Sequence, residues 1–235
     1  MAQLPRAPLS PLVAGEQQLP RELGGYLVRV LRLRAGDAFT LFDPEAGTEA
    51  HAHLLRDVPA LVRVGEPREA ARVTRRDVVL LQGFAKGDKP EQVLRAAVAL
   101  GASAVTFVRT ERSVAGAELR PERLRAVMLD AARQCGRGDL PTLRGLVELP
   151  AALEDARGLL LLLEPAAPES LVEVMREAPR DRAITLAVGP EGGFAAEEAG
   201  QLLAAGFLAV RLAPFVLRTE LAAVAALSVV AAHES

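Results

Sequence analysis

Several residue types are scarce or missing in this chain of 235 residues. It has one cysteine, three histidines, and no tryptophan or asparagine. A single cysteine, Cys135, excludes a disulfide within the chain and a cysteine-rich zinc site. The histidines, His51, His53 and His233, leave little capacity for another metal site, so we expect no metal. The formal net charge is −2, which argues against a strongly cationic nucleic-acid binder, although the mild basic excess lies in the first 150 residues.

Long hydrophobic runs are also missing. No apolar segment reaches the ~20 residues that a membrane-spanning helix needs, and the first residues contain no long apolar stretch typical of a secretion signal. We therefore expect a cytoplasmic protein that does not bind membranes. Residues 221–232 are apolar on all sides, which favours burial in a core or in a subunit interface.

The first part of the chain, residues 1–72, has the pattern of a small β domain. Residues 39–43, 49–54 and 61–64 are strand candidates, and in the second of these Ala50, Ala52 and Leu54 alternate with Glu49, His51 and His53. Short, evenly spaced strands suggest a barrel. A helical pattern covers residues 21–34, where Arg29 and Arg32 would share a face. The polar stretch 68–77 is the expected junction.

Residues 73–235 alternate between apolar strands and amphipathic helices. This alternation predicts an α/β domain with a largely parallel sheet that is covered on both faces. The expected strands are 78–81, 104–108, 159–163, 184–188 and 210–212, and the expected helices are 90–100, 121–134, 170–177, 196–205 and 221–232.

A glycine-rich segment, Gly189-Pro190-Glu191-Gly192-Gly193-Phe194, follows one of the buried strands and precedes a helix. Glycines at such a point allow a ligand to approach the backbone, and a helix N-terminus offers unpaired N–H groups. A simple tight turn is an equally good interpretation. The chain contains neither a G-x-G-x-x-G dinucleotide motif nor a P-loop.

Two more segments follow strands, Leu163-Glu164-Pro165 and residues 212–220, LAPFVLRTE. In the second, Thr219 is a candidate N-cap, and Arg218 and Glu220 lie at the mouth of the last helix, where a structural ion pair is the simplest interpretation. Together with residues 189–194, these segments lie at the carboxyl ends of strands, where open α/β sheets bind ligands.

The pair GPEGGF and LAPFVLRTE resembles the signature of the SPOUT superfamily of methyltransferases, which have a trefoil knot. Within it the chain is similar to the RsmE family of 16S rRNA uridine-N3 methyltransferases. Further matches are Val30–Leu33, Lys86-Gly87, Leu100-Gly101, the segment Thr110-Glu111-Arg112-Ser113, and Gln134-Cys135-Gly136-Arg137. The chain departs from the family pattern at Tyr26, Ala96 and Ala99.

The resemblance implies a SPOUT α/β-knot methyltransferase domain in residues 73–235 and a small PUA-like, RNA-binding β-barrel domain in residues 1–72. It implies S-adenosyl-L-methionine as cofactor, a homodimer, and 16S rRNA in the small ribosomal subunit as substrate. The expected cofactor-binding residues are Leu163, Glu164, Gly189, Pro190, Glu191, Gly192, Gly193, Leu212, Pro214 and Leu217.

Methylation at uridine N3 requires removal of the imide proton and positive charge near the uracil oxygens. Arg218 is the expected partner of the anionic base, and Glu220 either orients Arg218 or takes the proton. Candidate RNA-binding residues are Arg29, Arg32, Arg34, Arg112 and Arg137. Alternatives are a SPOUT enzyme that acts on a ribose 2′-hydroxyl or a tRNA base, a non-catalytic RNA-binding assembly factor, and a nucleotide-binding protein without RNA.

Overall fold

The computed structural model describes all residues except 1–3, 72–75, 114–118 and 235. Part of the expected junction, residues 72–75, therefore lies outside the described residues. The chain divides into two compact units, Met1–Arg72 with Ala132–Leu140, and Val73–Ala131 with Pro141–Ser235. Each unit has its own six-stranded sheet.

The first unit is built on a mostly antiparallel sheet. Its strand order is β1-β3-β4-β5-β2, with β6 paired to β4, and only the β1–β3 pair is parallel. The alternation expected around residues 50–54 is present, because Ala50, Ala52 and Leu54 are buried while His51 and His53 are exposed. The strands are β1 (Arg6–Pro8), β2 (Gly15–Gln18), β3 (Ala38–Asp43), β4 (Thr48–Asp57), β5 (Ala60–Val64) and β6 (Arg68–Glu69).

The helix between β2 and β3 is shorter than the sequence predicts. It consists of α1 (Arg21–Gly25) and one π-helical segment, η1 (Tyr26–Val30). The helix ends before Arg32, whose φ is +58°, so the expectation that Arg29 and Arg32 share a helix face is wrong. Gly24 allows α1 to pack closely on β5, because a Cβ at this position would lie 2.6 Å from the Cβ of Ala60.

Glu49 differs from its histidine neighbours on β4 because it is buried. Its carboxylate accepts hydrogen bonds from Arg6 at 2.8 Å and from Arg68 at 2.9 Å. Arg6 is itself 8% exposed, and its guanidinium lies 5.1 Å from the centre of the Phe42 ring. A carboxylate can be buried here because two arginines balance its charge.

The second unit has an entirely parallel sheet, as the sequence predicts. The strand order is β12-β10-β11-β7-β8-β9. The edge strand β9 was not expected, and β12 begins two residues earlier than the expected strand 210–212. The strands are β7 (Val78–Gly83), β8 (Ala104–Arg109), β9 (Thr142–Glu148), β10 (Leu159–Leu163), β11 (Ile184–Val188) and β12 (Leu208–Val210).

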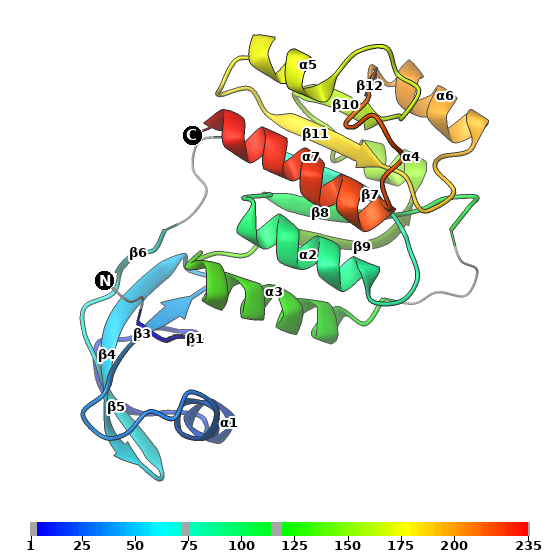
Figure 1. Cartoon of the computed structure of the whole chain (residues 1–235). Helices are drawn as coiled ribbons and strands as arrows, with labels where there is room; N and C mark the ends of the chain where they lie inside the picture. The colour runs from blue at the N-terminus through cyan, green and yellow to red at the C-terminus, as the bar shows by residue number, and fades with distance from the viewer. Residues whose placement is uncertain (1–3, 72–75, 114–118, 235) are drawn as a thin grey trace. The chain divides into compact units, whose positions relative to one another are not determined.

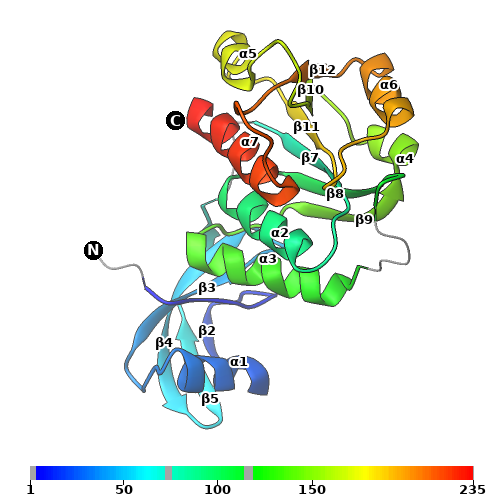
Figure 2. The same cartoon turned by 45° about the vertical axis from the view of Figure 1, so that its right-hand side comes forward.

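Helices cover both faces of this sheet (Figures 1 and 2). On one face, α7 (Thr219–Glu234) lies between α2 (Lys89–Ala99) and α5 (Leu171–Glu177), and α3 (Pro121–Cys135) runs beside α2. On the other face, α4 (Leu149–Leu153) and α6 (Ala196–Ala204) pack on the sheet through apolar side chains. None of the described helices is long and apolar enough to span a membrane.

Candidate functional site

Three loops at the carboxyl ends of β10, β11 and β12 line one cavity in the second unit. They are the three loops that the sequence marks as candidates for ligand binding. The structure places the predicted residues Leu163, Glu164, Gly189, Pro190, Glu191, Gly193, Leu212 and Leu217 on the cavity wall. It does not place Gly192 or Pro214 on the cavity wall.

The glycine-rich loop after β11 is both a tight turn and part of the cavity wall. The N–H of Gly193 donates to the carbonyl of Pro190 at 2.9 Å, and Gly193 has a φ of +69°. A Cβ on Gly189 would lie 2.9 Å from the Cα of Gly193. Glycine is therefore needed at both ends of the turn.

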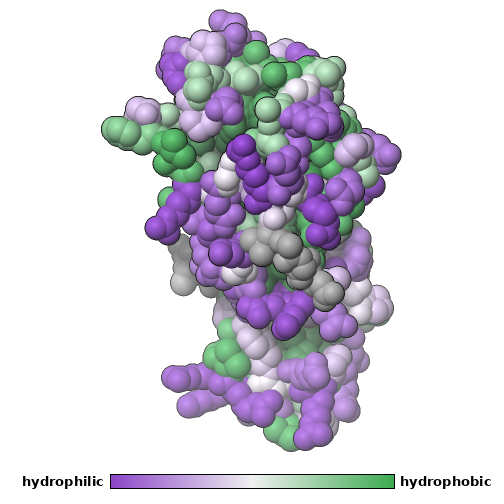
Figure 3. Space-filling view, turned by 90° about the vertical axis from the view of Figure 1, so that its right-hand side faces the viewer, coloured by the Kyte–Doolittle hydropathy of each residue, from purple (hydrophilic) through white to green (hydrophobic). Residues whose placement is uncertain are grey.

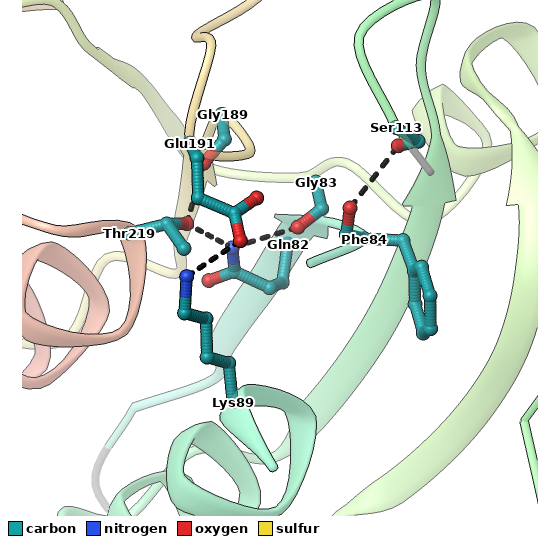
Figure 4. Close-up of polar contacts among 8 residues, drawn as sticks. All are labelled: Gln82, Gly83, Phe84, Lys89, Ser113, Gly189, Glu191 and Thr219. Carbon is teal, nitrogen blue, oxygen red and sulfur yellow. Dashed lines mark hydrogen bonds and ion pairs between the residues drawn. The ribbon is translucent and has the colours of Figure 1, made fainter. Parts of the chain in front are cut away.

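A buried chain of hydrogen bonds ties this loop to β7 and α7 (Figure 4). The Thr219 hydroxyl donates to the carbonyl of Gly189 at 2.6 Å and accepts from the Gln82 amide at 2.8 Å. Gln82 also donates to the carbonyl of Gly83 at 3.0 Å, and its own Oε1 has no partner among the described residues. Thr219 is the first residue inside α7, and its hydroxyl bonds to the loop rather than to the helix N-terminus. The prediction that Thr219 is the N-cap is therefore wrong.

Lys89, at the start of α2, forms an ion pair with Glu191 of the same loop at 2.5 Å (Figure 4). Burial alone would raise the pKa of Glu191. The hydrogen bond from Lys89 and the charges of Lys89 and Lys86 outweigh burial and hold this pKa below its ordinary value. The carboxylate therefore stays charged at neutral pH and fixes one side of the loop.

Arg112 crosses the other side of the glycine-rich loop. Its guanidinium donates to the carbonyl of Gly192 at 2.6 Å and of Phe194 at 3.4 Å. A Cβ on Gly192 would lie 3.1 Å from the Arg112 side chain, so glycine leaves room for the arginine. The neighbouring Glu111 N–H donates to Glu198 on α6 at 2.7 Å. The segment 110–113 thus supports the site from outside the cavity.

Arg218 and Glu220 flank Thr219 but lie in different environments. Arg218 is exposed, whereas Glu220 is 7% exposed. The Oε2 atom of Glu220 is buried without a hydrogen-bond partner in the described part of the chain. The two side chains form no ion pair with each other, so the simple structural interpretation of this pair does not hold. A buried acceptor without a donor is costly in a fold and suits a site that receives a proton or a ligand.

The remaining candidate arginines have different degrees of exposure. Arg29, Arg32 and Arg34 are exposed in the first unit. Arg137 is 7% exposed and donates to both carboxylate oxygens of Asp139, at 2.8 and 3.0 Å, so its side chain is engaged inside the first unit. Figure 3 shows a molecular face that is mainly hydrophilic with small, separate apolar patches.

Three other positions singled out in the sequence have clear surroundings. Cys135 is exposed. Tyr26 is half-buried, and the guanidinium of Arg133 lies 4.4 Å from the centre of its ring. Among the described residues, histidine, cysteine and acidic side chains form no cluster suited to a metal ion.

Gln82, Lys89, Thr219 and Glu198 support the loops through side chains that sequence reasoning did not assign to the site. Gln82 carries a local signal, because it is a polar residue at the end of the apolar strand VVLLQG. Thr219 lies in a segment that the sequence marked, and Glu198 accepts from the nearby N–H of Ala195. Lys89 becomes meaningful only through its contact with the distant Glu191.

Comparisons with known proteins give consistent matches over nearly the whole chain. The family described as RNA methyltransferase domain matches residues 73–231, and the RNA methyltransferase PUA domain matches residues 19–56. The chain is 33% identical to ribosomal RNA small subunit methyltransferase E of Mycobacterium bovis, over 88% of this chain and 82% of that protein. It is 31% identical to the protein of the same name from Synechocystis, over 86% of this chain and 68% of that protein.

A solved structure is similar across both units of the chain. The ribosomal RNA small subunit methyltransferase E of Neisseria gonorrhoeae, bound to S-adenosyl methionine, has a TM-score of 0.85 and 29% identity. The match covers 96% of this chain and 96% of that chain.

Proposed function

Because the chain belongs to the ribosomal RNA small subunit methyltransferase E family, we propose that it methylates N3 of one uridine in 16S rRNA with S-adenosyl-L-methionine as methyl donor. The observation that carries this proposal is the cavity formed by the loops after β10, β11 and β12. These loops supply the apolar walls and the backbone hydrogen-bonding groups that such a cofactor requires.

The cavity fits the cofactor by its apolar walls and its backbone polar groups. Leu163, Val188, Leu212 and Leu217 give apolar walls for a flat adenine ring, and the loops offer backbone N–H and C=O groups for its polar edge. Gly189 and Gly193 line the cavity without side chains, so a ligand can approach the backbone there. When bound, the cofactor supplies an electrophilic methyl group on a sulfonium centre.

The residues at the start of α7 then act on the uridine. The imide N–H of uracil is a poor nucleophile, so its proton must leave before or during methyl transfer. Glu220 accepts this proton, since its buried Oε2 has no hydrogen-bond donor among the described residues. Arg218 is exposed beside it and binds the uracil oxygens on which negative charge develops.

The proposal assigns RNA binding and methyl transfer to two different domains of the chain. Residues 1–72 form a PUA-like RNA-binding domain, in which Arg29, Arg32 and Arg34 contact phosphates of the assembled small subunit. Residues 73–235 form the methyltransferase domain, whose C-terminal segment threads a trefoil knot. Arg112 acts mainly by holding the cofactor loop. We do not assign Arg137 to RNA binding, because its guanidinium is bonded to Asp139.

The same proposal includes a homodimer in the cytoplasm. Phe215, Val216 and Leu221 are 82%, 79% and 51% exposed beside the cofactor loops, and they provide an apolar surface for a second copy. A dimer would cover these side chains and the exposed side of α7. Sedimentation analysis of the wild-type chain and of Leu221→Asp tests this part separately, because Leu221 does not line the cofactor cavity.

Methyl transfer to small ribosomal subunits that lack the modification tests the proposed function directly. The purified chain is incubated with labelled S-adenosyl-L-methionine, and the rRNA nucleosides are identified by mass spectrometry. We expect N3-methyluridine at a single site. Label in a ribose, in a tRNA base or in another nucleoside would overturn the target, and cofactor binding without transfer would favour the non-catalytic alternative.

A further inference from the structure

The first unit contains a second cavity that the proposed methyl transfer does not use. It has a volume of about 560 Å³, which lies within the usual range for small-molecule sites. Its walls come from residues 18–29, at the end of β2 and along α1 and η1, and from the turn 57–60 between β4 and β5. All of these residues belong to the first unit.

The walls of this cavity are largely apolar. Leu19, Val28 and Pro59 contribute apolar surface, and Val58 on the turn is 81% exposed. Gly24 removes a side chain where α1 meets β5, so the helix backbone itself forms part of the wall. Such surfaces suit the face of a planar ring that has left its stack.

The charged side chains that line the cavity are two arginines and one aspartate, and Gln18 adds a neutral polar side chain. Arg21 and Arg29 line it, are exposed, and form no ion pair within the described residues. Among the described residues, Gly25 provides the one hydrogen-bond partner of the Arg29 side chain, a carbonyl at the long distance of 3.4 Å. Asp57 also lines the cavity, and its Oδ1 is buried with no hydrogen-bond donor in the described part of the chain.

We propose that this cavity binds one unstacked nucleotide of the RNA substrate, with guanine as the preferred base. Guanine presents adjacent N1–H and N2–H donors on its Watson–Crick edge, which match the two oxygens of a carboxylate such as Asp57. Arg21 and Arg29 contact the flanking phosphates as bidentate donors. This inference rests on the proposed function as an RNA-binding enzyme and names a recognition site outside its reaction centre.

Nucleotide titrations of the isotope-labelled full chain test the proposal. GMP, AMP, CMP and UMP are added separately while backbone NMR signals are followed, and binding of a labelled single-stranded RNA decamer is measured by fluorescence anisotropy. We expect GMP to shift the signals of residues 18–29 and 57–60 and to bind about tenfold more tightly than UMP, as one good carboxylate–base pair allows.

Three variants separate this site from general charge attraction. Asp57→Asn should abolish the preference for GMP, and Arg21→Ala combined with Arg29→Ala should weaken decamer binding about tenfold. Arg63→Ala is the matched control, because Arg63 is an exposed arginine of the same unit that pairs with Glu16 outside the cavity, and it should leave both values unchanged. Shifts confined to other residues, or equal binding of all four nucleotides, would overturn the proposal.

Methyl transfer to small subunits is measured on the same protein samples. Transfer by wild type without nucleotide shifts at the cavity would overturn this inference and leave the proposed function intact. Nucleotide shifts at the cavity without methyl transfer to any rRNA would support this inference and overturn the proposed function.

Discussion

The hydroxyl of Thr219 donates to the carbonyl of Gly189 at 2.6 Å and so joins the first turn of the last helix to the glycine-rich loop after β11. The same hydroxyl accepts from Gln82, which comes from the end of β7. Three segments far apart in the sequence therefore share one buried oxygen atom, and the shape of the cavity depends on it.

Thr219→Val should loosen this junction. The substitution keeps the side-chain volume but leaves the Gly189 carbonyl and the Gln82 amide without their partner, at a cost of about 1–3 kcal/mol in stability. Cofactor affinity should fall with it because the loop loses its anchor. Thermal unfolding and calorimetric titration with S-adenosyl-L-methionine measure the two effects. Thr219→Ser retains the hydroxyl and is the control; equal losses in both variants would argue against the role of the hydrogen bond.

Arg112→Ala should weaken cofactor binding about tenfold, because the carbonyls of Gly192 and Phe194 lose the guanidinium that holds them. Arg109→Ala is a matched control from the adjacent end of β8, since Arg109 forms only an exposed ion pair with Glu148. Equilibrium titration with the cofactor in the absence of RNA gives the comparison. If Arg112→Ala changed only the KM for small subunits, the arginine would act on RNA rather than on the loop.

Arg218→Ala should lower kcat by roughly 10²–10³-fold while the cofactor Kd stays unchanged, because it removes a donor from the developing uracil anion. Arg218→Lys keeps the charge but loses the bidentate fork, so its kcat should lie between those of wild type and Arg218→Ala. Single-turnover methyl transfer to small subunits separates this step from product release. Full turnover in Arg218→Ala would remove Arg218 from the mechanism.

Glu220→Gln should slow methyl transfer because the amide cannot accept the N3 proton. The rate of the variant should recover partly as pH rises, since more of the uridine is then already deprotonated in solution. Wild type should gain less over the same pH range. A rate profile for Glu220→Gln that runs parallel to that of wild type would instead assign Glu220 to the orientation of Arg218.

Sequence patterns predicted the parallel sheet and the cavity loops where the signal was local. Apolar strands followed by glycine or proline marked the cavity loops, because strand burial and turn formation depend on residues that are adjacent in the sequence. The strand β9 was missed because Arg144 and Gly145 interrupt its apolar pattern at the edge of the sheet. The role of Gln82 was missed because its partners are Thr219, 137 residues away, and the carbonyl of the neighbouring Gly83.

Glu49 shows the same limit within the first unit. Its place in an alternating strand predicts an exposed side chain, yet Arg6, 43 residues earlier, and Arg68, 19 residues later, bury it. Contacts between residues so far apart in the sequence produce no periodic pattern from which they could be predicted. Their consequence is nevertheless testable through the dependence of stability on pH.

Glu49 should contribute stability that acid removes. Burial raises the pKa of its carboxyl, but the hydrogen bonds and charges of Arg6 and Arg68 outweigh burial and hold the pKa below its ordinary value of 4.5. The unfolded chain therefore binds more protons near this pH, so the contribution is present above pH 4.5 and is lost as pH falls through the folded-state pKa.

Glu49→Gln should lose about 3 kcal/mol of stability at neutral pH, because Arg6 is left buried and unbalanced, and its stability should depend less steeply on pH in acid. Denaturant unfolding across this pH range measures both, and Glu16→Gln, which alters only an exposed pair with Arg63, should match wild type. A parallel acid dependence in Glu49→Gln and wild type would contradict the assignment.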